Sequence, residues 1–285
     1  ITSVPSSTTF TFSVTTSNQS ATGTISCKIA PLGWTRVYTG TNKSVYCSSD
    51  ITSTQLYLRV DDNNAKSATV AMYEVMYDVD NGARGTTVYW GKSSAASSAT
   101  RSWYIIGDSK TFYFLNDVSA TTQYGPYIFG DILSFRDSDP WACMLGGATA
   151  IDPSTPSTNY GVLAGSGSSN GQYIARSCLF YGSSVALGIY TATRTSVIGA
   201  ATSAPPWPSP LDGKVHLVDG YCYEPGQTVY RGRIPGLKYP MEGPGGAFAN
   251  RDITVIQDGR TYMAFKAYNL GNMWFDITGG ATGWD

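Results

Sequence analysis

Hydrophobic and polar residues alternate along much of this chain with the two-residue period of a β-strand. The alternation is clear at residues 9–14, where Phe10, Phe12 and Val14 share one face, and it returns at residues 24–29 and 55–60. Residues 68–77 are rich in β-branched and aromatic side chains, which favours a strand over a short helix. The pattern therefore predicts a chain built mainly from strands.

The most hydrophobic stretch, residues 101–136, predicts a hairpin and a further strand. Apolar runs flank the turn residues 107–110, and another apolar run covers residues 127–135. Such near-continuous runs indicate either a sheet that is covered on both faces or an oligomer interface. Shorter strands are predicted at residues 37–38, 44–47, 172–175, 184–190, 214–217, 253–256, 261–266 and 273–277, with an Asp-Gly hairpin turn at residues 257–260.

Loop-forming residues divide the chain. Small and polar residues at 145–171 predict a long surface loop, and four prolines within residues 205–210 predict an extended linker or arm. We expect residues 1–30 to be the end of an N-terminal β-domain whose upstream part is missing. Residues 31–200 then form a central β-domain, 201–215 the Pro-rich linker or arm, and 216–285 a C-terminal β-subdomain.

Composition narrows the classes of protein further. Only 14% of the 285 residues are charged, and Glu occurs only at Glu74, Glu224 and Glu242, which argues against helical bundles and coiled coils. A pI of about 5.8 argues against a nucleic-acid-binding face, and no segment resembles a membrane span. The predicted fold is mainly β: sandwich-like or barrel-like domains with long loops and few helices.

The five cysteines lie far apart, at positions 27, 47, 143, 178 and 222. No C-x-x-C pair is present, and the chain has a single histidine, so we expect no zinc site or other metal site. Buried free thiols are the favoured interpretation. A bridge between Cys27 and Cys47 stays open as an alternative.

Three segments resemble catalytic or metal-binding motifs without meeting their requirements. The Asp-rich residues 78–82 have Tyr89 where a calcium loop needs its twelfth-position Glu, so we expect a turn. Residues 167–171 match G-x-S-x-G but precede a predicted strand instead of a helix. His216 has Asp219 nearby as a hypothetical triad partner, yet its alternating neighbours favour an ordinary strand position. We expect no catalytic residues, no cofactor and no enzymatic activity.

Aromatic and basic side chains in turn-rich segments are better candidates for contacts with other subunits. Residues 231–240 combine basic, aromatic and turn-forming residues, which predicts a structured loop that docks on a neighbour. The candidate interface residues are Trp34, Trp207, Arg231, Arg233, Leu237 and Tyr239.

Several segments together resemble a poorly characterised family of tailed-bacteriophage virion structural proteins. They are APLGW (30–34), YTGTNKSVY (38–46), LYLRVDD (56–62), YEVMYDVD (73–80), WYIIGD (103–108), RGRIPGL (231–237), DGR (258–260) and FDITG (275–279). The resemblance spans roughly residues 1–115 and 216–285. It implies a location in the virion and other phage virion proteins as partners, and it carries no catalytic residues.

These observations predict a structural component of a tailed-phage virion, a tail or baseplate subunit that forms a homo-oligomer through subunit interfaces. The alternative within this class is a capsid-decorating protein. A second class is an adhesin that binds a host-surface glycan through loops 145–171 or 201–215. An enzyme acting on envelope polysaccharide ranks last.

Overall fold

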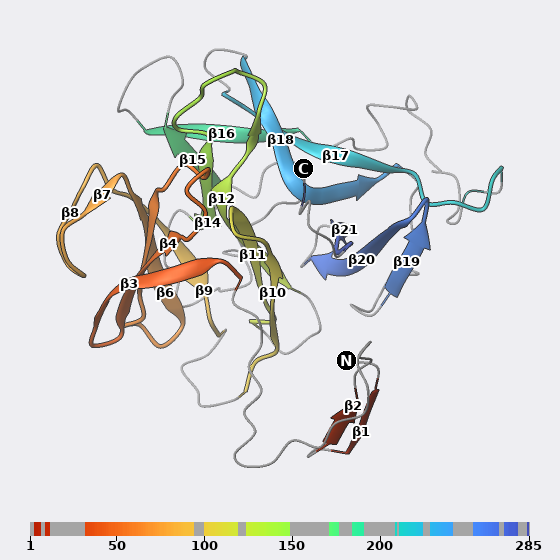
Figure 1. Cartoon of the computed structure of the whole chain (residues 1–285), viewed down its shortest axis with the longest axis horizontal. Coiled ribbons are helices and arrows are strands. Elements are labelled where there is room, and N and C mark those ends of the chain that lie inside the picture. Colours follow the sequence, from red (N-terminus) through yellow and green to blue (C-terminus); the bar gives the residue numbers. More distant parts are fainter. Residues whose placement is uncertain are drawn as a thin grey trace, which may run out of the picture. The chain divides into compact units, whose positions relative to one another are not determined.

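The computed structural model describes eleven stretches of the chain and two single residues, 209 and 284 (Figure 1). They are residues 3–6, 9–11, 32–93, 100–118, 124–148, 171–176, 184–190, 209, 211–224, 229–241, 253–267, 271–278 and 284. The chain divides into two compact units, residues 1–31 and residues 32–285. In the first unit, β1 (Ser3–Ser6) and β2 (Thr9–Thr11) pair as an antiparallel hairpin.

The described residues are built from strands, which confirms the predicted mainly β fold. They contain no helix, and therefore no helix that is long and apolar enough to cross a membrane. All the strand pairs are antiparallel, so alternate side chains of each strand point to opposite faces of a sheet.

The second unit begins with a curved antiparallel meander. Its strands are β3 (Trp34–Gly40), β4 (Lys43–Ser48), β5 (Tyr57–Asp61), β6 (Ser67–Tyr73) and β9 (Thr86–Gly91). Each strand pairs with the one before it in this order. The short strands β7 (Val75–Met76) and β8 (Gly82–Ala83) form a separate hairpin between β6 and β9.

A central sheet follows the meander in sequence. It consists of β10 (Trp103–Gly107), β11 (Thr111–Asn116), β12 (Gly125–Asp131) and β14 (Cys143–Ala148), paired in that order. Ala148 of β14 also pairs with Tyr89 of β9, which joins the central sheet to the meander.

The remaining strands form a C-terminal sheet. They are β13 (Leu133–Ser134), β15 (Gly171–Arg176), β16 (Ser184–Tyr190), β17 (Leu217–Glu224), β18 (Val229–Pro240), β19 (Ile253–Gln257), β20 (Arg260–Ala267) and β21 (Gly271–Asp276). The pairing runs from β14 through β15, β16, β17, β18, β21 and β20 to β19, and β13 pairs with β18.

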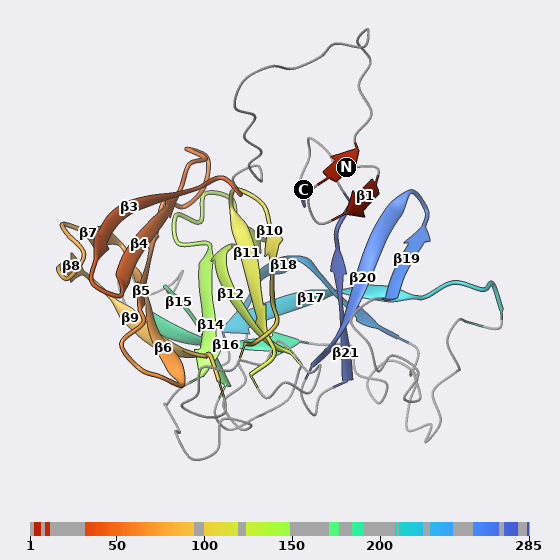
Figure 2. The same cartoon turned by 90° about the horizontal axis from the view of Figure 1, so that it is seen from below.

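The central sheet lies between the meander and the C-terminal sheet (Figure 2), and a hydrophobic core covers each of its faces. Phe112 and Phe114 of β11 point into the meander core, which they share with side chains of β5, β6 and β9. Tyr113 and Leu115 of the same strand point into the C-terminal core, beside Leu237 and other side chains of the C-terminal sheet. The apolar run of residues 101–136 thus belongs to a sheet covered on both faces, one of the two predicted explanations.

Two predicted hairpins are confirmed. Strands β10 and β11 flank the turn at residues 107–110, and Asp108 N donates to Thr111 O at 2.9 Å. Strands β19 and β20 flank Asp258 and Gly259, whose φ angles of 51° and 75° are those of a two-residue turn with both central residues left-handed.

Two predicted loops are corrected. Residues 145–148, expected at the start of a surface loop, belong to the buried strand β14, because their backbone pairs with β12, β15 and, at Ala148, β9. Residues 231–240 lie within the long strand β18 instead of a loop. The turn residues Pro235 and Gly236 are accommodated by a register shift opposite β17, and Gly236 has a φ of 68°.

The predicted linker 201–215 falls mostly outside the described residues, of which it includes 209 and 211–215. β13 and β16, from the predicted central domain, pair with β18 and β17 from the predicted C-terminal subdomain. The boundary between those two domains stays a prediction.

Because both faces of the central sheet are buried, a substitution in either core should lower the stability of the protein by a predictable amount. Leu115→Ala should lower the free energy of unfolding by about 2–5 kcal/mol, because it leaves a cavity where a fully buried side chain fills the C-terminal core. Urea denaturation measures the change. Leu211→Ala is the matched control, since Leu211 is 93% exposed and its truncation should change the stability little. Equal effects of the two substitutions would contradict the double-faced sheet.

Candidate functional site

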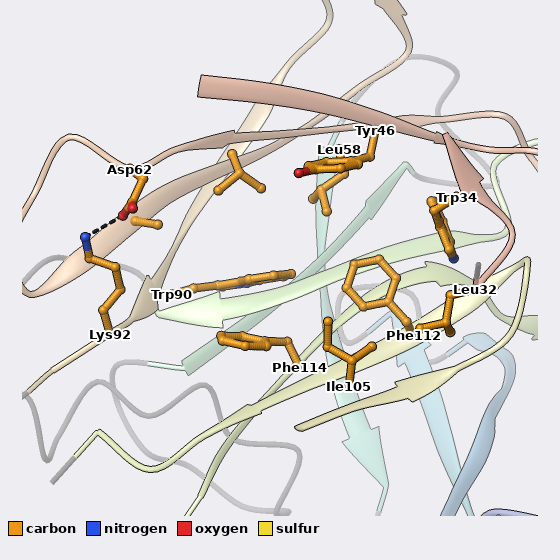
Figure 3. A pocket seen from close by; sticks show the side chains of 12 residues that line it. Leu32, Trp34, Tyr46, Leu58, Asp62, Trp90, Lys92, Ile105, Phe112 and Phe114 are labelled. Carbon is orange, nitrogen blue, oxygen red and sulfur yellow. Dashed lines mark hydrogen bonds and ion pairs between the residues drawn. The ribbon is translucent and has the colours of Figure 1, made fainter. Parts of the chain in front are cut away.

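A pocket of about 440 Å³ opens between the meander and the central sheet (Figure 3). Its lining is apolar or aromatic except for one acidic and one basic side chain. The lining residues are Leu32, Trp34, Tyr46, Leu58, Val60, Asp62, Ala68, Trp90, Lys92, Ile105, Phe112 and Phe114. The pocket is thus the part of the meander core that the two sheets do not fill.

Ring contacts fix the shape of the pocket wall. Trp34 and Phe112 meet edge to face with their centroids 5.1 Å apart, and Trp90 stacks on Phe114 at 5.7 Å with 21° between the ring planes. Aromatic pairs in these geometries are favourable beyond the area they bury. The wall is therefore formed before any ligand arrives.

Both indole N–H groups of the wall already have acceptors. Trp34 Nε1 donates to the carbonyl oxygen of Asp108, and Trp90 Nε1 donates to that of Gly146, each at 2.9 Å. These bonds satisfy the polar edges of the rings inside the protein. They leave the ring faces and the aliphatic side chains to contact a ligand.

The pocket has one charged end and one apolar end. Lys92 Nζ and a carboxylate oxygen of Asp62 form an ion pair at one end, and Leu32 and Ile105 lie at the other (Figure 3). The side chains of Lys92 and Asp62 are 33% and 53% exposed, so the pair is in contact with water. Its attraction is correspondingly weak, and either partner can turn toward a ligand.

Strand β10 presents exposed apolar side chains next to the pocket. Trp103 and Ile105 are 59% and 43% exposed, whereas Tyr104 and Ile106, on the opposite face of the strand, pack against the C-terminal core. Among the described strands, β10 pairs with β11 alone, so it is an edge of the central sheet. We call Trp103 and Ile105 the β10 apolar face.

The six candidate interface residues have different environments. Trp34 lines the pocket, and Trp207 lies outside the described residues. Arg233 is on the surface, where its side chain is 44% exposed and pairs with Asp219 at 3.4 Å. Leu237 and Tyr239 belong to the C-terminal core.

Arg231 is fully buried and joins two carboxylates. Its guanidinium donates to both oxygens of Asp139, through Nε at 3.1 Å and Nη2 at 3.2 Å, and Nη1 donates to Glu224 at 2.6 Å. Nη2 also donates to the carbonyl oxygen of Trp141 at 3.0 Å. A buried guanidinium is tolerated only when it is paired in this way. Arg231, Leu237 and Tyr239 therefore have interior roles in place of the predicted contacts with a neighbouring subunit.

The segments that resembled catalytic or metal-binding motifs have structural explanations where they are described. The carboxylate of Asp78 accepts hydrogen bonds from the backbone N–H groups of Asp80 and Asn81, which confirms the predicted turn. His216 Nε2 lies 3.0 Å from Asp212, whereas Asp219 pairs with Lys238 and Arg233, so the hypothetical His216–Asp219 pair is not formed.

Two further expectations concern the G-x-S-x-G match at residues 167–171 and the metal site. Most of the G-x-S-x-G match lies outside the described residues, and strand β15 begins at its last glycine, as predicted. Across the part of the chain that the structure describes, no three His, Cys, Asp or Glu side chains come close enough to hold a metal ion.

Three cysteines, Cys47, Cys143 and Cys222, are buried free thiols. The Sγ of Cys47 donates to the carbonyl oxygen of Gln55, and Cys27, the partner in the alternative bridge, lies outside the described residues. Burial raises the pKa of all three thiols, that of Cys222 to about 12. The described thiols are therefore packing groups and not nucleophiles.

The buried arginine network can be tested with two residues of one strand. Arg231→Met should lower the free energy of unfolding by about 3–5 kcal/mol, because it leaves two buried carboxylates without the cation that pairs with them. Arg233→Met is the control on the solvent side of β18 and should cost at most about 1 kcal/mol. Chemical denaturation compares the two, and a larger loss for Arg233→Met would refute the interior role.

Thiol reactivity supplies a second test. With a pKa of about 12, about one Cys222 thiol in ten thousand is ionised at pH 8, so alkylation by iodoacetamide should be very slow in the native protein. Peptide mass spectrometry should find Cys47, Cys143 and Cys222 largely unmodified in the native state and fully modified in urea. Rapid alkylation of native Cys222 would show that the C-terminal core is open to solvent.

No protein-family model matches this chain, and no curated protein matches its sequence. The resemblance to tailed-phage virion proteins therefore stays a prediction. The pocket, its Asp62–Lys92 pair and the β10 apolar face are the features from which a function has to be argued.

Proposed function

We propose that the chain is a structural subunit of a tailed-bacteriophage virion that works through contacts between subunits, with a tail or baseplate position preferred. Its partners are other copies of itself and other virion proteins. In this proposal the protein has no catalytic role.

The β10 apolar face is the observation that carries the proposal. Large apolar side chains that stay exposed next to one another, here Trp103 and Ile105, are typical of surfaces that another protein covers. Because β10 is a sheet edge among the described strands, its outer backbone groups can also pair with a strand of a neighbour. An aromatic side chain beside an open strand edge is a favourable combination for subunit assembly.

The low charge of the chain is consistent with this role. Charged residues make up only 14% of the sequence, and interface centres are depleted of charge. A capsid-decorating protein would use the same kind of surface, so it remains the alternative position within the particle.

A glycan-binding adhesin draws no support from the pocket. Sugar recognition needs several free hydrogen-bonding groups around a ring, whereas the indole N–H groups of Trp34 and Trp90 are already bonded within the chain. The two loops proposed for glycan binding lie mostly outside the described residues.

The assembly proposal predicts that the β10 apolar face is needed for self-association. The double variant Trp103→Ser/Ile105→Ser should weaken oligomer formation by at least about tenfold, because central aromatic residues often contribute most of the binding free energy. Light scattering coupled to size-exclusion chromatography over a range of concentrations measures the change.

Ile256→Ser is the control, since Ile256 is 76% exposed on β19, away from β10. This variant should associate like the unmodified chain. A chain that stays monomeric at every concentration, and that mass spectrometry does not find in purified phage particles, would overturn the proposal.

A further inference from the structure

The pocket has the size of a small-molecule site. Its volume of about 440 Å³ gives room for roughly 15 groups of the size of a water molecule or a methylene. Ligand sites in proteins commonly span about 300–1,000 Å³ and are largely preformed. A single apolar side chain from a neighbour would leave much of this space empty.

The walls of the pocket favour a hydrocarbon over a polar ring. Phe112, Phe114 and Leu58 offer no hydrogen bonds, and the indole N–H groups of Trp34 and Trp90 are engaged inside the protein. Apart from the Tyr46 hydroxyl, these walls offer no partner to a ligand hydroxyl, which would lose its water on entering. A hydrocarbon body gains from leaving water and meets flat aromatic faces.

The charged end of the pocket defines the other half of the ligand. Asp62 accepts hydrogen bonds and Lys92 donates them, and the pair together carries no net charge. A hydroxyl or amide group can donate to the carboxylate and accept from the ammonium at the same time. A charged head group would be attracted by one partner and repelled by the other.

We propose that this pocket binds an uncharged amphiphile. Its hydrocarbon body lies between the aromatic walls, and its hydroxyl or amide end lies at the Asp62–Lys92 pair (Figure 3). The proposal does not depend on the virion role, because it concerns a small ligand inside the pocket and not a protein partner, although Ile105 belongs to both the pocket lining and the β10 apolar face.

Binding can be measured with the full chain and N-phenyl-1-naphthylamine, an uncharged probe that fluoresces in apolar sites. The probe should bind, and its binding should quench the fluorescence of Trp34 and Trp90, which line the pocket. 1-Dodecanol should displace it, whereas dodecanoate and dodecyltrimethylammonium should be at least about tenfold weaker competitors. Ala68→Phe should abolish probe binding, because Ala68 lines the pocket opposite Trp90 on the neighbouring strand.

The Asp62–Lys92 pair supplies a test that does not rely on filling the core. Asp62→Asn leaves Lys92 alone and should strengthen dodecanoate binding by about tenfold. Lys92→Met leaves Asp62 alone and should strengthen dodecyltrimethylammonium binding to a similar degree. The exposed pair Lys214–Asp258, which does not line the pocket, provides the matched controls Lys214→Met and Asp258→Asn, and neither should change the ligand preference.

Three results would overturn the proposal. The first is a folded chain that does not take up the probe. The second is a combined result, in which Ala68→Phe leaves probe binding unchanged and all the charge variants show the same preference among the three head groups. The third is probe uptake by the monomer alone, lost as the chain associates, which would assign the pocket to a second copy of the chain.

Discussion

The structure of residues 32–285 depends on one constraint, that the central sheet of β10, β11, β12 and β14 is buried on both faces. A strand sends alternate side chains in opposite directions, so a sheet covered twice must be apolar at almost every position. Strand β11 meets this requirement, with Phe112 and Phe114 in one core and Tyr113 and Leu115 in the other. The meander and the C-terminal sheet each cover one face, and neither core would close without this shared wall.

The C-terminal sheet needs additional stabilising contacts because β18 contains Pro235 and Gly236, which do not suit a regular strand. The register shift opposite β17 absorbs them, and Tyr113 of the central sheet donates a hydrogen bond to the carbonyl oxygen of Pro235. The buried guanidinium of Arg231 adds polar bonds to Asp139 and Glu224 near the other end of the strand. Such a network adds little net stability, since its desolvation offsets much of its attraction.

The meander leaves its core partly open, and both functional proposals arise from that opening. The meander and the central sheet are joined where β9 pairs with β14, and side chains of β3 and β4 also hydrogen-bond to the β10–β11 turn. Aromatic rings line the space between them, and the β10 apolar face lies at its rim. The interior of the pocket suits a small hydrocarbon ligand, whereas the rim suits another protein, and Ile105 is common to the pocket lining and the β10 apolar face.

The sequence by itself determined the strands whose apolar pattern was strong and the turns with Gly or Asp at their tips, because both follow from local backbone preferences. It also limited the apolar run of residues 101–136 to one of two explanations, a sheet covered on both faces or an oligomer interface. Tertiary structure alone decided that the Gly-containing residues 145–148 and the Pro-Gly segment of β18 are strands, because neighbouring strands and not propensity hold them there. It decided too that Arg231 is interior and that Asp62 and Lys92 meet across 30 positions of sequence, since pairing between distant side chains depends on the packing of whole sheets.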